Sequence, residues 1–233
     1  MVMNGILLKL GIVPYQEAKE IQLKALEFVK NERTEMILMT LQHPPVYTIG
    51  RAGGFENILI PMEELKKLAE VYEVERGGNI TFHGPGQIVA YPIINLNKWE
   101  KDVHKFVYFL EECVIRLLKD YGIEGSRKEK YTGVWVEDEK ICAIGVAVKR
   151  WITWHGIALN VNTDLSYFSK INPCGIREYG VTSLQKLGIN ADINEVEEKL
   201  IQKFQEVFCV NFKEMTIDEF LKWSEQNCKN LNG

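Results

Sequence analysis

The 233-residue sequence lacks any uninterrupted run of the roughly eighteen apolar residues that a membrane-spanning helix needs. Its N-terminal apolar run, Ile6–Leu8, is broken by Lys9 and has no basic leader, so no secretory signal peptide is predicted. These absences predict a cytoplasmic protein that does not have a membrane as its partner.

The sequence also lacks any pairing pattern among its cysteines. The five cysteines are widely separated, and neither a Cys-x-x-Cys nor a His-x-x-x-His spacing occurs. An odd, scattered set is neither a disulfide framework nor a zinc pattern. We therefore expect no metal site, and free thiols in a reducing compartment, where one of them can act as a nucleophile.

A large excess of positive charge is missing as well. The net charge is −4, which argues against nucleic-acid binding. Apolar residues make up 46% and charged residues 26% of the chain. This share of apolar residues is enough for a sizeable core and too high for a disordered chain. Without internal repeats or linkers, residues 1–233 are expected to form one catalytic domain.

The hydrophobic pattern predicts an α+β domain with a mixed, mainly antiparallel sheet flanked by helices. Helical spacing and capping boxes predict helices from Pro14 to Lys30, from Pro61 to about Glu70, over Val103–Tyr121 and through the C-terminal quarter, with starts near Asp192 and Thr216. Strands are predicted at Ile6–Val13, Met36–Leu41, Val46–Ile49, on both sides of Gly84-Pro85-Gly86, and at Gly133–Val136, Ile141–Val148 and Trp151–Val161.

One cysteine lies in a turn rather than on a packed face. Cys174 follows Pro173 and precedes Gly175, whereas Cys113 and Cys142 fall within a predicted helix and strand. A free cysteine is usually a small buried hydrophobe, and that description suits the latter two. For Cys174, the residues alone leave a buried thiol and a reactive thiol both open.

Two further segments are ambiguous from their residues alone. Arg76–Gln87 is rich in glycine, and such a run forms either tight turns or a loop that approaches a ligand closely. It matches neither a phosphate-binding loop nor a dinucleotide fingerprint. Lys140 follows Glu137-Asp138-Glu139, where it reads as one more solvated charge at a hairpin tip.

Taken together, these segments resemble the lipoyl/octanoyl transferase family, often called LipB, which shares its core with biotin and lipoate protein ligases. The resemblance rests on RGGNITFHGPGQIVAY at residues 76–91, HPPVYTIGR at 43–51, KICAIGVAV at 140–148, HGIALNV at 155–161, and INPCGI with VTSL at 171–184. The motifs occur in family order and extend over some two-thirds of the chain.

The resemblance implies transfer of octanoyl from octanoyl-acyl carrier protein to a lysine of lipoyl domains, those of 2-oxo-acid dehydrogenase complexes and the glycine cleavage H protein. Cys174 would carry the acyl group as a thioester, and Lys140 would lower the pKa of that thiol and move protons. Substrate would be bound by Arg76, Gly77, Gly78, Asn79, Ile80, Thr81, Phe82, His83, Ala143, Ile144, Gly145, Gly156, Ile157 and Ala158. No cofactor is implied, and a monomer is expected.

Three alternatives remain open at this point. An ATP-dependent lipoate or biotin ligase on the same fold would need no counterpart of Cys174. A cysteine hydrolase would pair Cys174 with His83 or His155, because thiol–imidazole pairs are the commoner arrangement. A non-catalytic module would bind lipoyl domains without turnover.

Overall fold

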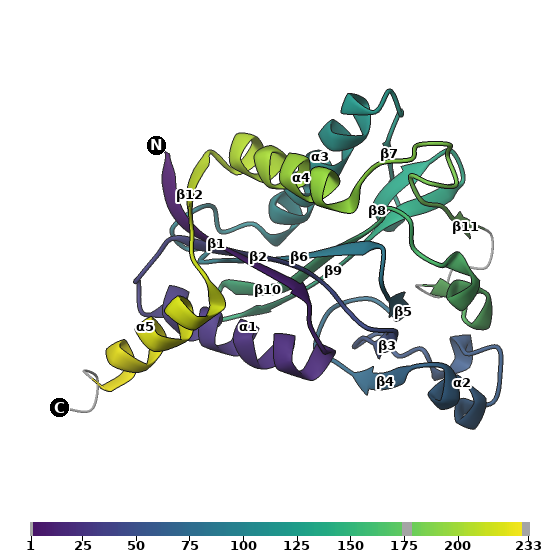
Figure 1. The fold of residues 1–233 in the computed structure, drawn as a ribbon, viewed down its shortest axis with the longest axis horizontal. Helices are drawn as coiled ribbons and strands as arrows, with labels where there is room; N and C mark the ends of the chain where they lie inside the picture. Colours follow the sequence, from purple (N-terminus) through teal and green to yellow (C-terminus); the bar gives the residue numbers. More distant parts are fainter. Residues whose placement is uncertain (1, 174–178, 230–233) are drawn as a thin grey trace.

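The structure, a computed structural model, describes residues 2–173 and 179–229 of the chain (Figure 1). A large twisted sheet forms its centre. In spatial order its strands are β12 (Val210–Glu214), β1 (Met3–Ile12), β2 (Met36–Gln42), β6 (Gln87–Ile94), β10 (Ile152–Asn160), β9 (Glu139–Lys149), β8 (Tyr131–Val136) and β7 (Ser126–Lys128), with β11 (Gly180–Val181) beside β9.

Most neighbouring strands of this sheet run antiparallel. The exceptions are β1, which is parallel to both β12 and β2, and β11, which is parallel to β9. The prediction of a mixed, mainly antiparallel sheet is confirmed.

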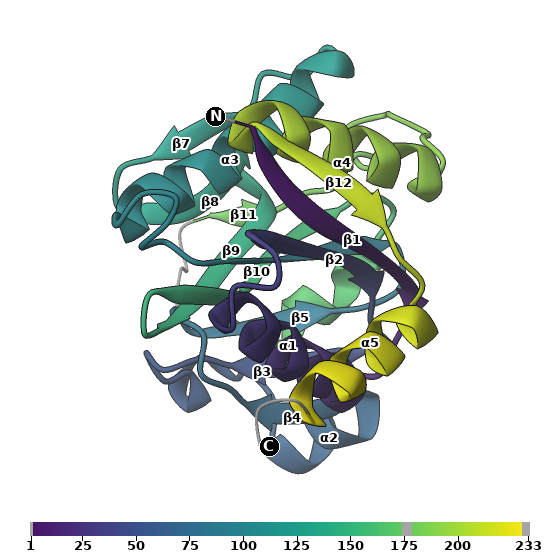
Figure 2. The same ribbon diagram turned by 90° about the vertical axis from the view of Figure 1, so that its left-hand side faces the viewer.

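Helices cover both faces of the sheet, as the two views in Figures 1 and 2 show. Helices α3 (Val103–Asp120) and α4 (Ile193–Phe208) lie on one face, and α1 (Tyr15–Lys30) and α5 (Ile217–Lys229) lie on the other. Phe106, Leu110 and Phe204 are fully buried in the first layer, and Ala18, Ala25 and Phe220 in the second. Burial of these helical stripes is the main favourable term in the stability of the fold.

A smaller sheet stands at one end of the large one. It consists of β4 (Glu70–Glu73), β3 (Val46–Ile49) and β5 (Ile80–His83), and packs with α2 (Met62–Leu68) and the 3-10 helices η1 (Phe55–Asn57) and η2 (Leu165–Lys170). Its core includes Phe82, whose ring stacks on Tyr167 at a centroid distance of 4.4 Å. Strand β5 leads directly into β6, so one segment joins the two sheets.

The helix starts predicted from capping boxes are confirmed. The Asp192 side chain accepts hydrogen bonds from the backbone N–H groups of Asn194 and Glu195. Thr216 and Glu219 each accept from the other's backbone N–H, which satisfies two N–H groups at the start of α5.

The prediction of a wholly helical C-terminal quarter is wrong at Val210–Glu214. That segment is β12, which pairs in parallel with β1. Val210 is buried beside it while Asn211 is exposed, so the short stretch alternates as an edge strand does. The predicted helix to Glu70 ends earlier, at Leu68, because Glu70 already begins β4.

Two leucines on helices test the packing of α3. Leu110→Ala, at a fully buried position, should lower the free energy of unfolding by about 2–5 kcal/mol because it leaves a cavity. Leu23→Ala, at a position 42% exposed on α1, should change it by about 0.5 kcal/mol or less. Urea denaturation measures both, and equal losses would contradict the assignment of α3 to the core.

Candidate active site

A cleft lies over the paired strands β9 and β10, on the side where small residues face each other. Ala143 pairs with Ala158, and Gly145 pairs with Gly156, so this strip of sheet carries little side-chain bulk. The cleft is lined by Tyr15, Thr48, Arg76, Gly78, Thr81, His83, Tyr91, Ala143, Ile144, Gly145, His155, Gly156, Ile157 and Ala158. We call it the acyl cleft below, after the group that the family resemblance implies for it.

Arg76 crosses the acyl cleft above Gly145. A Cβ at Gly145 would lie 2.9 Å from Arg76 Cδ, so the glycine leaves room for the arginine stem. The Arg76 guanidinium is buried and donates to the Thr48 carbonyl at 2.6 Å and to Thr48 Oγ1 at 2.9 Å. The next residue anchors the loop to the sheet, because Gly77 N–H donates to the Val146 carbonyl at 2.8 Å.

A chain of buried hydrogen bonds continues from Thr48. Thr48 Oγ1 lies 3.3 Å from His83 Nε2, and His83 Nδ1 lies 2.8 Å from Gln87 Oε1. Gln87 Nε2 donates to Asn160 Oδ1 at 2.9 Å, and Asn160 Nδ2 donates to the Thr182 carbonyl at 3.0 Å. These hydrogen bonds therefore connect the Arg76 loop to the segment that follows Cys174. Both ring nitrogens of His83 already have a partner within them.

The histidines around the acyl cleft are neutral at physiological pH. The pKa of His43 is lowered to about 4 and that of His83 and His155 to about 3, mainly by burial, and the positive charge of Arg76 contributes to the lowering in the latter two. His43 Nδ1 faces the Val13 carbonyl and so carries its proton, which leaves Nε2 to accept from the Tyr91 hydroxyl. Imidazoles with such low pKa values are poor general bases near pH 7.

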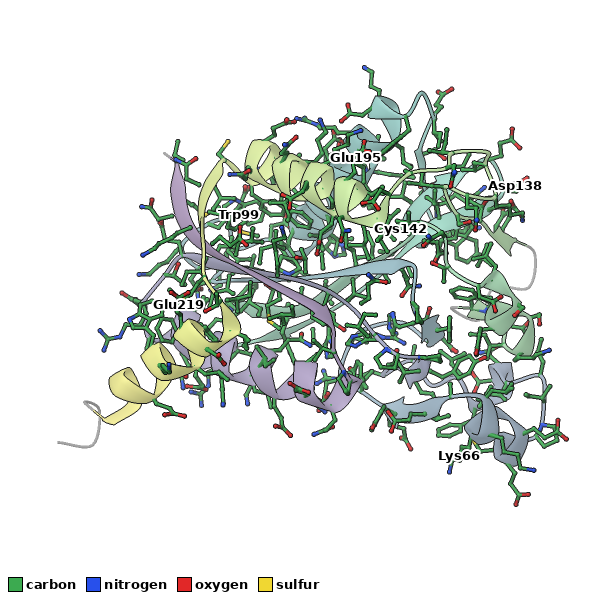
Figure 3. The ribbon with its side chains drawn as sticks, in the orientation of Figure 1. Lys66, Trp99, Asp138, Cys142, Glu195 and Glu219 are labelled. Carbon is green, nitrogen blue, oxygen red and sulfur yellow. The ribbon has the colours of Figure 1, made fainter. Side chains whose placement is uncertain are left out.

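Lys140 is buried rather than solvated, so the description from its neighbouring charges alone is wrong. Its exposed fraction is 6%, and Nζ donates to the Thr132 carbonyl at 3.0 Å and lies 4.8 Å from the Trp135 ring centroid. Asp138, two residues earlier, does lie at the outer surface (Figure 3). The difference arises because Lys140 already belongs to β9, where its backbone carbonyl accepts from Thr182 N–H.

Gly133 makes the position of the Lys140 side chain possible. A Cβ there would lie 3.2 Å from Lys140 Cε and 2.6 Å from the Cys142 carbonyl oxygen. Gly133 also has a φ of +130°, a conformation that residues with side chains rarely adopt. Both observations require glycine beneath the lysine.

The segments that flank Cys174 converge on Lys140, although Cys174 itself lies outside the described residues. Pro173 lines a small cavity together with Lys140, and Asn172 N–H donates to the Asn57 carbonyl at 2.7 Å. On the other side, Val181 pairs with Lys140 in the β11–β9 ladder. This Lys140 cavity adjoins the acyl cleft, because both are lined by Thr81, Ala143 and Ala158.

Three further cysteines, Cys113, Cys142 and Cys209, are not candidates for a nucleophile in this cleft. Cys113 on α3 and Cys142 on β9 are fully buried in the layer between the sheet and helices α3 and α4, as Figure 3 shows for Cys142, and Cys209 is exposed at the end of α4. Burial raises the pKa of the Cys142 thiol to about 12. The burial expected for Cys113 and Cys142 from their places in a helix and a strand is confirmed.

Four residues expected to bind substrate do not line the acyl cleft. Gly77 lines a neighbouring groove with Lys140, Ile80 and Phe82 point into the core of the small sheet, and Asn79 hydrogen-bonds Asn57. Strand alternation explains Ile80 and Phe82, since Thr81 and His83 face the cleft and their neighbours in β5 face away, whereas Gly77 and Asn79 precede the strand.

Sequence reasoning assigned Tyr15, Thr48 and Tyr91 no role in binding, yet all three line the acyl cleft. Thr48 and Tyr91 lie within segments that carry the family resemblance. Tyr15 gave no signal beyond its place at the start of a helix.

Comparisons with known proteins agree with this geometry. The family model of the lipoyl protein ligase A/B catalytic domain matches residues 14–205. The chain belongs to this family. Proteins named octanoyltransferase from Thermoanaerobacter sp. (strain X514) and Caldanaerobacter subterraneus subsp. tengcongensis are 72% and 68% identical to it, each over 92% of this chain and over 95% and 94% of their own length. These relatives confirm the predicted octanoyltransferase activity, which is an acyltransferase activity.

Solved structures share the fold. A lipoate-protein ligase A bound with ATP superimposes with a TM-score of 0.78 at 19% identity, over 96% of this chain and 94% of the other. A bipartite lipoate protein ligase from Thermoplasma acidophilum gives 0.74 at 20% identity, over 96% and 91%. At this identity the likeness establishes the ligase-like fold alone. Within residues 2–173 and 179–229, no helix is long and apolar enough to cross a membrane.

The neutral histidines give a prediction for pH. His43, His83 and His155 should show no titration between pH 8 and about pH 5 by nitrogen-15 NMR of the native protein, whereas the urea-unfolded chain should titrate near the ordinary value of about 6.5. Because the folded pKa values lie below the unfolded ones, the unfolded state takes up more protons as the pH falls below about 6.5. Each histidine then lowers the unfolding free energy by at most about 1.4 kcal/mol per pH unit. Native midpoints near 6.5 would contradict the burial.

Two glycine variants test whether the Lys140 side chain needs a glycine at position 133. Gly133→Ala should reduce octanoyl transfer about tenfold or more, because the added Cβ would lie 2.6 Å from the Cys142 carbonyl oxygen and 3.2 Å from Lys140 Cε, so that both strand and lysine must shift. Gly122→Ala is the matched control, since Gly122 also has a positive φ but has no atom within 4 Å of the added Cβ. The measurements are transfer kcat/KM and melting temperature, and equal transfer rates in the two variants would contradict the role of Gly133.

Proposed function

We propose that this protein moves octanoyl from octanoyl-acyl carrier protein to a lysine of lipoyl domains through a thioester on Cys174, with Lys140 as the proton partner and without a cofactor. The observation that carries the proposal is that Pro173, the neighbour of Cys174, lines the same cavity as Lys140. The pairing of Val181 with Lys140 supports it from the other side of Cys174.

The first half-reaction is a thioester exchange. The Cys174 thiolate attacks the octanoyl carbonyl, the carbon–sulfur bond to the carrier breaks, and the carrier leaves as a thiol once it has received a proton. A cysteine of ordinary pKa is only a few per cent thiolate at pH 7, and an ammonium group within about 4–6 Å favours the thiolate. Lys140 can supply that charge, hold the thiol proton and return it to the leaving sulfur.

The second half-reaction forms an amide. The lysine amine of the acceptor attacks the acyl-enzyme carbonyl, the bond to Cys174 breaks, and the amine loses a proton. A base is needed for that proton, and the role we assign to Lys140 is supported by its buried Nζ, which contacts the Thr132 carbonyl and the Trp135 ring. The resting thiolate–ammonium pair is then restored.

Lysine suits this role better than the nearby histidines do. Both nitrogens of His83 are committed within the buried hydrogen-bond chain, and the pKa values of His83 and His155 are about 3. A cysteine–histidine hydrolase would need one of them as a base near pH 7. The site therefore favours transfer to an amine over hydrolysis by an imidazole-activated thiol.

The choice of partners rests on relatives. Octanoyltransferases at up to 72% identity support octanoyl as the group transferred. A structural neighbour described together with its E2 lipoyl domain supports a lipoyl domain as acceptor. We extend this to the lipoyl domains of 2-oxo-acid dehydrogenase complexes and to the glycine cleavage H protein, and we propose that a cytoplasmic monomer performs the transfer.

Intact mass spectrometry tests the acyl-enzyme. Mixed with octanoyl-acyl carrier protein, the wild type should gain one octanoyl group that hydroxylamine removes and that added lipoyl domain discharges, without ATP. Cys174→Ser should gain none, whereas Cys209→Ser, which changes an exposed thiol next to the edge strand β12, should behave as the wild type does. Lys140→Ala should slow both half-reactions at least about a hundredfold.

An undiminished adduct in Cys174→Ser would remove that thiol from the mechanism. A requirement for ATP with free octanoate would instead identify a ligase.

A further inference from the structure

The acyl cleft has an end that is remote from Lys140. The part bounded by Thr81, Ala143 and Ala158 is shared with the Lys140 cavity. Tyr15 and His155 line the cleft but neither that cavity nor the groove beside it. Six other cleft residues share this property, but His155 also pairs with Val146, three residues along β9 from Ala143. The ring of Tyr15 packs near His43, His43 packs near Tyr91, and Tyr91 packs near His155. We therefore take Tyr15 and His155 as the remote end, where the tail of a bound acyl group would terminate.

A backbone irregularity aims His155 into this end. His155 has a φ of +57° in the middle of β10, and its ring stacks on that of its neighbour Trp154, with centroids 4.3 Å apart. Successive side chains of a regular strand point to opposite faces, so the positive φ has turned the imidazole to the Trp154 side. Gln22 Oε1 on α1 accepts from His155 N–H at 2.8 Å and holds this conformation.

Two polar atoms at the remote end are buried without a hydrogen-bond partner among the described residues. They are Tyr15 Oη and His155 Nε2, on side chains of residues that are 3% and 2% exposed. Buried polar atoms are nearly always satisfied, and a native structure keeps such groups where a ligand or water completes them. Both atoms belong to residues that line the cleft, so a bound group can complete them there.

The distance along the sheet suits an eight-carbon chain. From Ala143, which borders the Lys140 cavity, to Val146, which pairs with His155, is three residues of β9, or about 10 Å. An extended octanoyl chain spans about 9 Å from its carbonyl carbon to its methyl group, at roughly 1.3 Å per bond. The methyl group of octanoyl would thus stop just short of His155.

We propose that Tyr15 and His155 form a polar stop that sets the length of the acyl chain, and that the cleft also accepts acyl groups with a hydroxyl on the terminal carbon. The proposal rests on the proposed function and adds a specificity determinant to it. A ninth carbon would press a methyl group against two unpaired polar atoms, whereas a hydroxyl in the same place would hydrogen-bond them. Such a mismatch costs roughly five- to a hundredfold in kcat/KM.

The test compares two isosteric donors, nonanoyl- and ω-hydroxyoctanoyl-acyl carrier protein, with octanoyl-acyl carrier protein as the reference. The quantity measured is the ratio of kcat/KM for the ω-hydroxyoctanoyl donor to that for the nonanoyl donor. We expect a ratio of about ten or more in the wild type. In Tyr15→Phe, which removes only the hydroxyl, the ratio should fall about fivefold or more.

Tyr72→Phe is the matched control. Tyr72 stacks on Tyr15 at a centroid distance of 5.3 Å, but its hydroxyl donates to Glu70 and it does not line the acyl cleft. Its ratio should stay within about twofold of the wild type, because the unpaired atoms are unchanged.

The outcomes separate this proposal from the proposed function. Normal octanoyl transfer with a wild-type ratio of one or less, or a ratio that Tyr15→Phe leaves unchanged, overturns the polar stop and leaves the thioester mechanism standing. Failure of the wild type to take octanoyl onto Cys174 overturns both.

Discussion

The site depends on one buried run of hydrogen bonds, from Arg76 through Thr48, His83, Gln87 and Asn160 to the Thr182 carbonyl. It joins the small sheet, the large sheet and the segment after Cys174. Because each member is buried, the loss of one partner leaves another polar group unsatisfied, and such networks fix a unique arrangement. The run therefore fixes the acyl cleft relative to the Lys140 cavity, and in the proposed mechanism its members take no part in the bond-making steps.

Three glycines leave the space that the buried side chains and closely packed strands of the site occupy. At Gly145 the Arg76 stem occupies the space of a side chain, and at Gly133 the Lys140 stem does. At Gly156 a Cβ would lie 2.2 Å from the Ala90 carbonyl oxygen, so β10 and β6 approach closely beneath the cleft. Long cationic side chains can thus lie buried against the sheet, with their heads held by carbonyl oxygens rather than by solvent.

Most of the fold could be predicted from local pattern, because amphipathic helices such as α3 and capping boxes such as that at Asp192 repeat at fixed spacing. The short strand β12 could not, since it is stabilised by pairing with β1 at the other end of the chain. The site shows the same division. The neighbours of Lys140 indicated a surface charge, and only the family resemblance singled it out. His155 lines the cleft through a single unusual φ, which no sequence pattern reports.

The residues that flank positions 174–178 are held by contacts with parts of the chain far away in sequence, Asn172 with Asn57 and Val181 with Lys140. Closing such long loops is slow compared with forming helices or hairpins. The segments on either side of Cys174 are therefore expected to reach the Lys140 strand later than the β9–β10 hairpin forms. In the proposed mechanism, a nascent or partly folded chain would then not be acylated, because the transfer requires the assembled molecule.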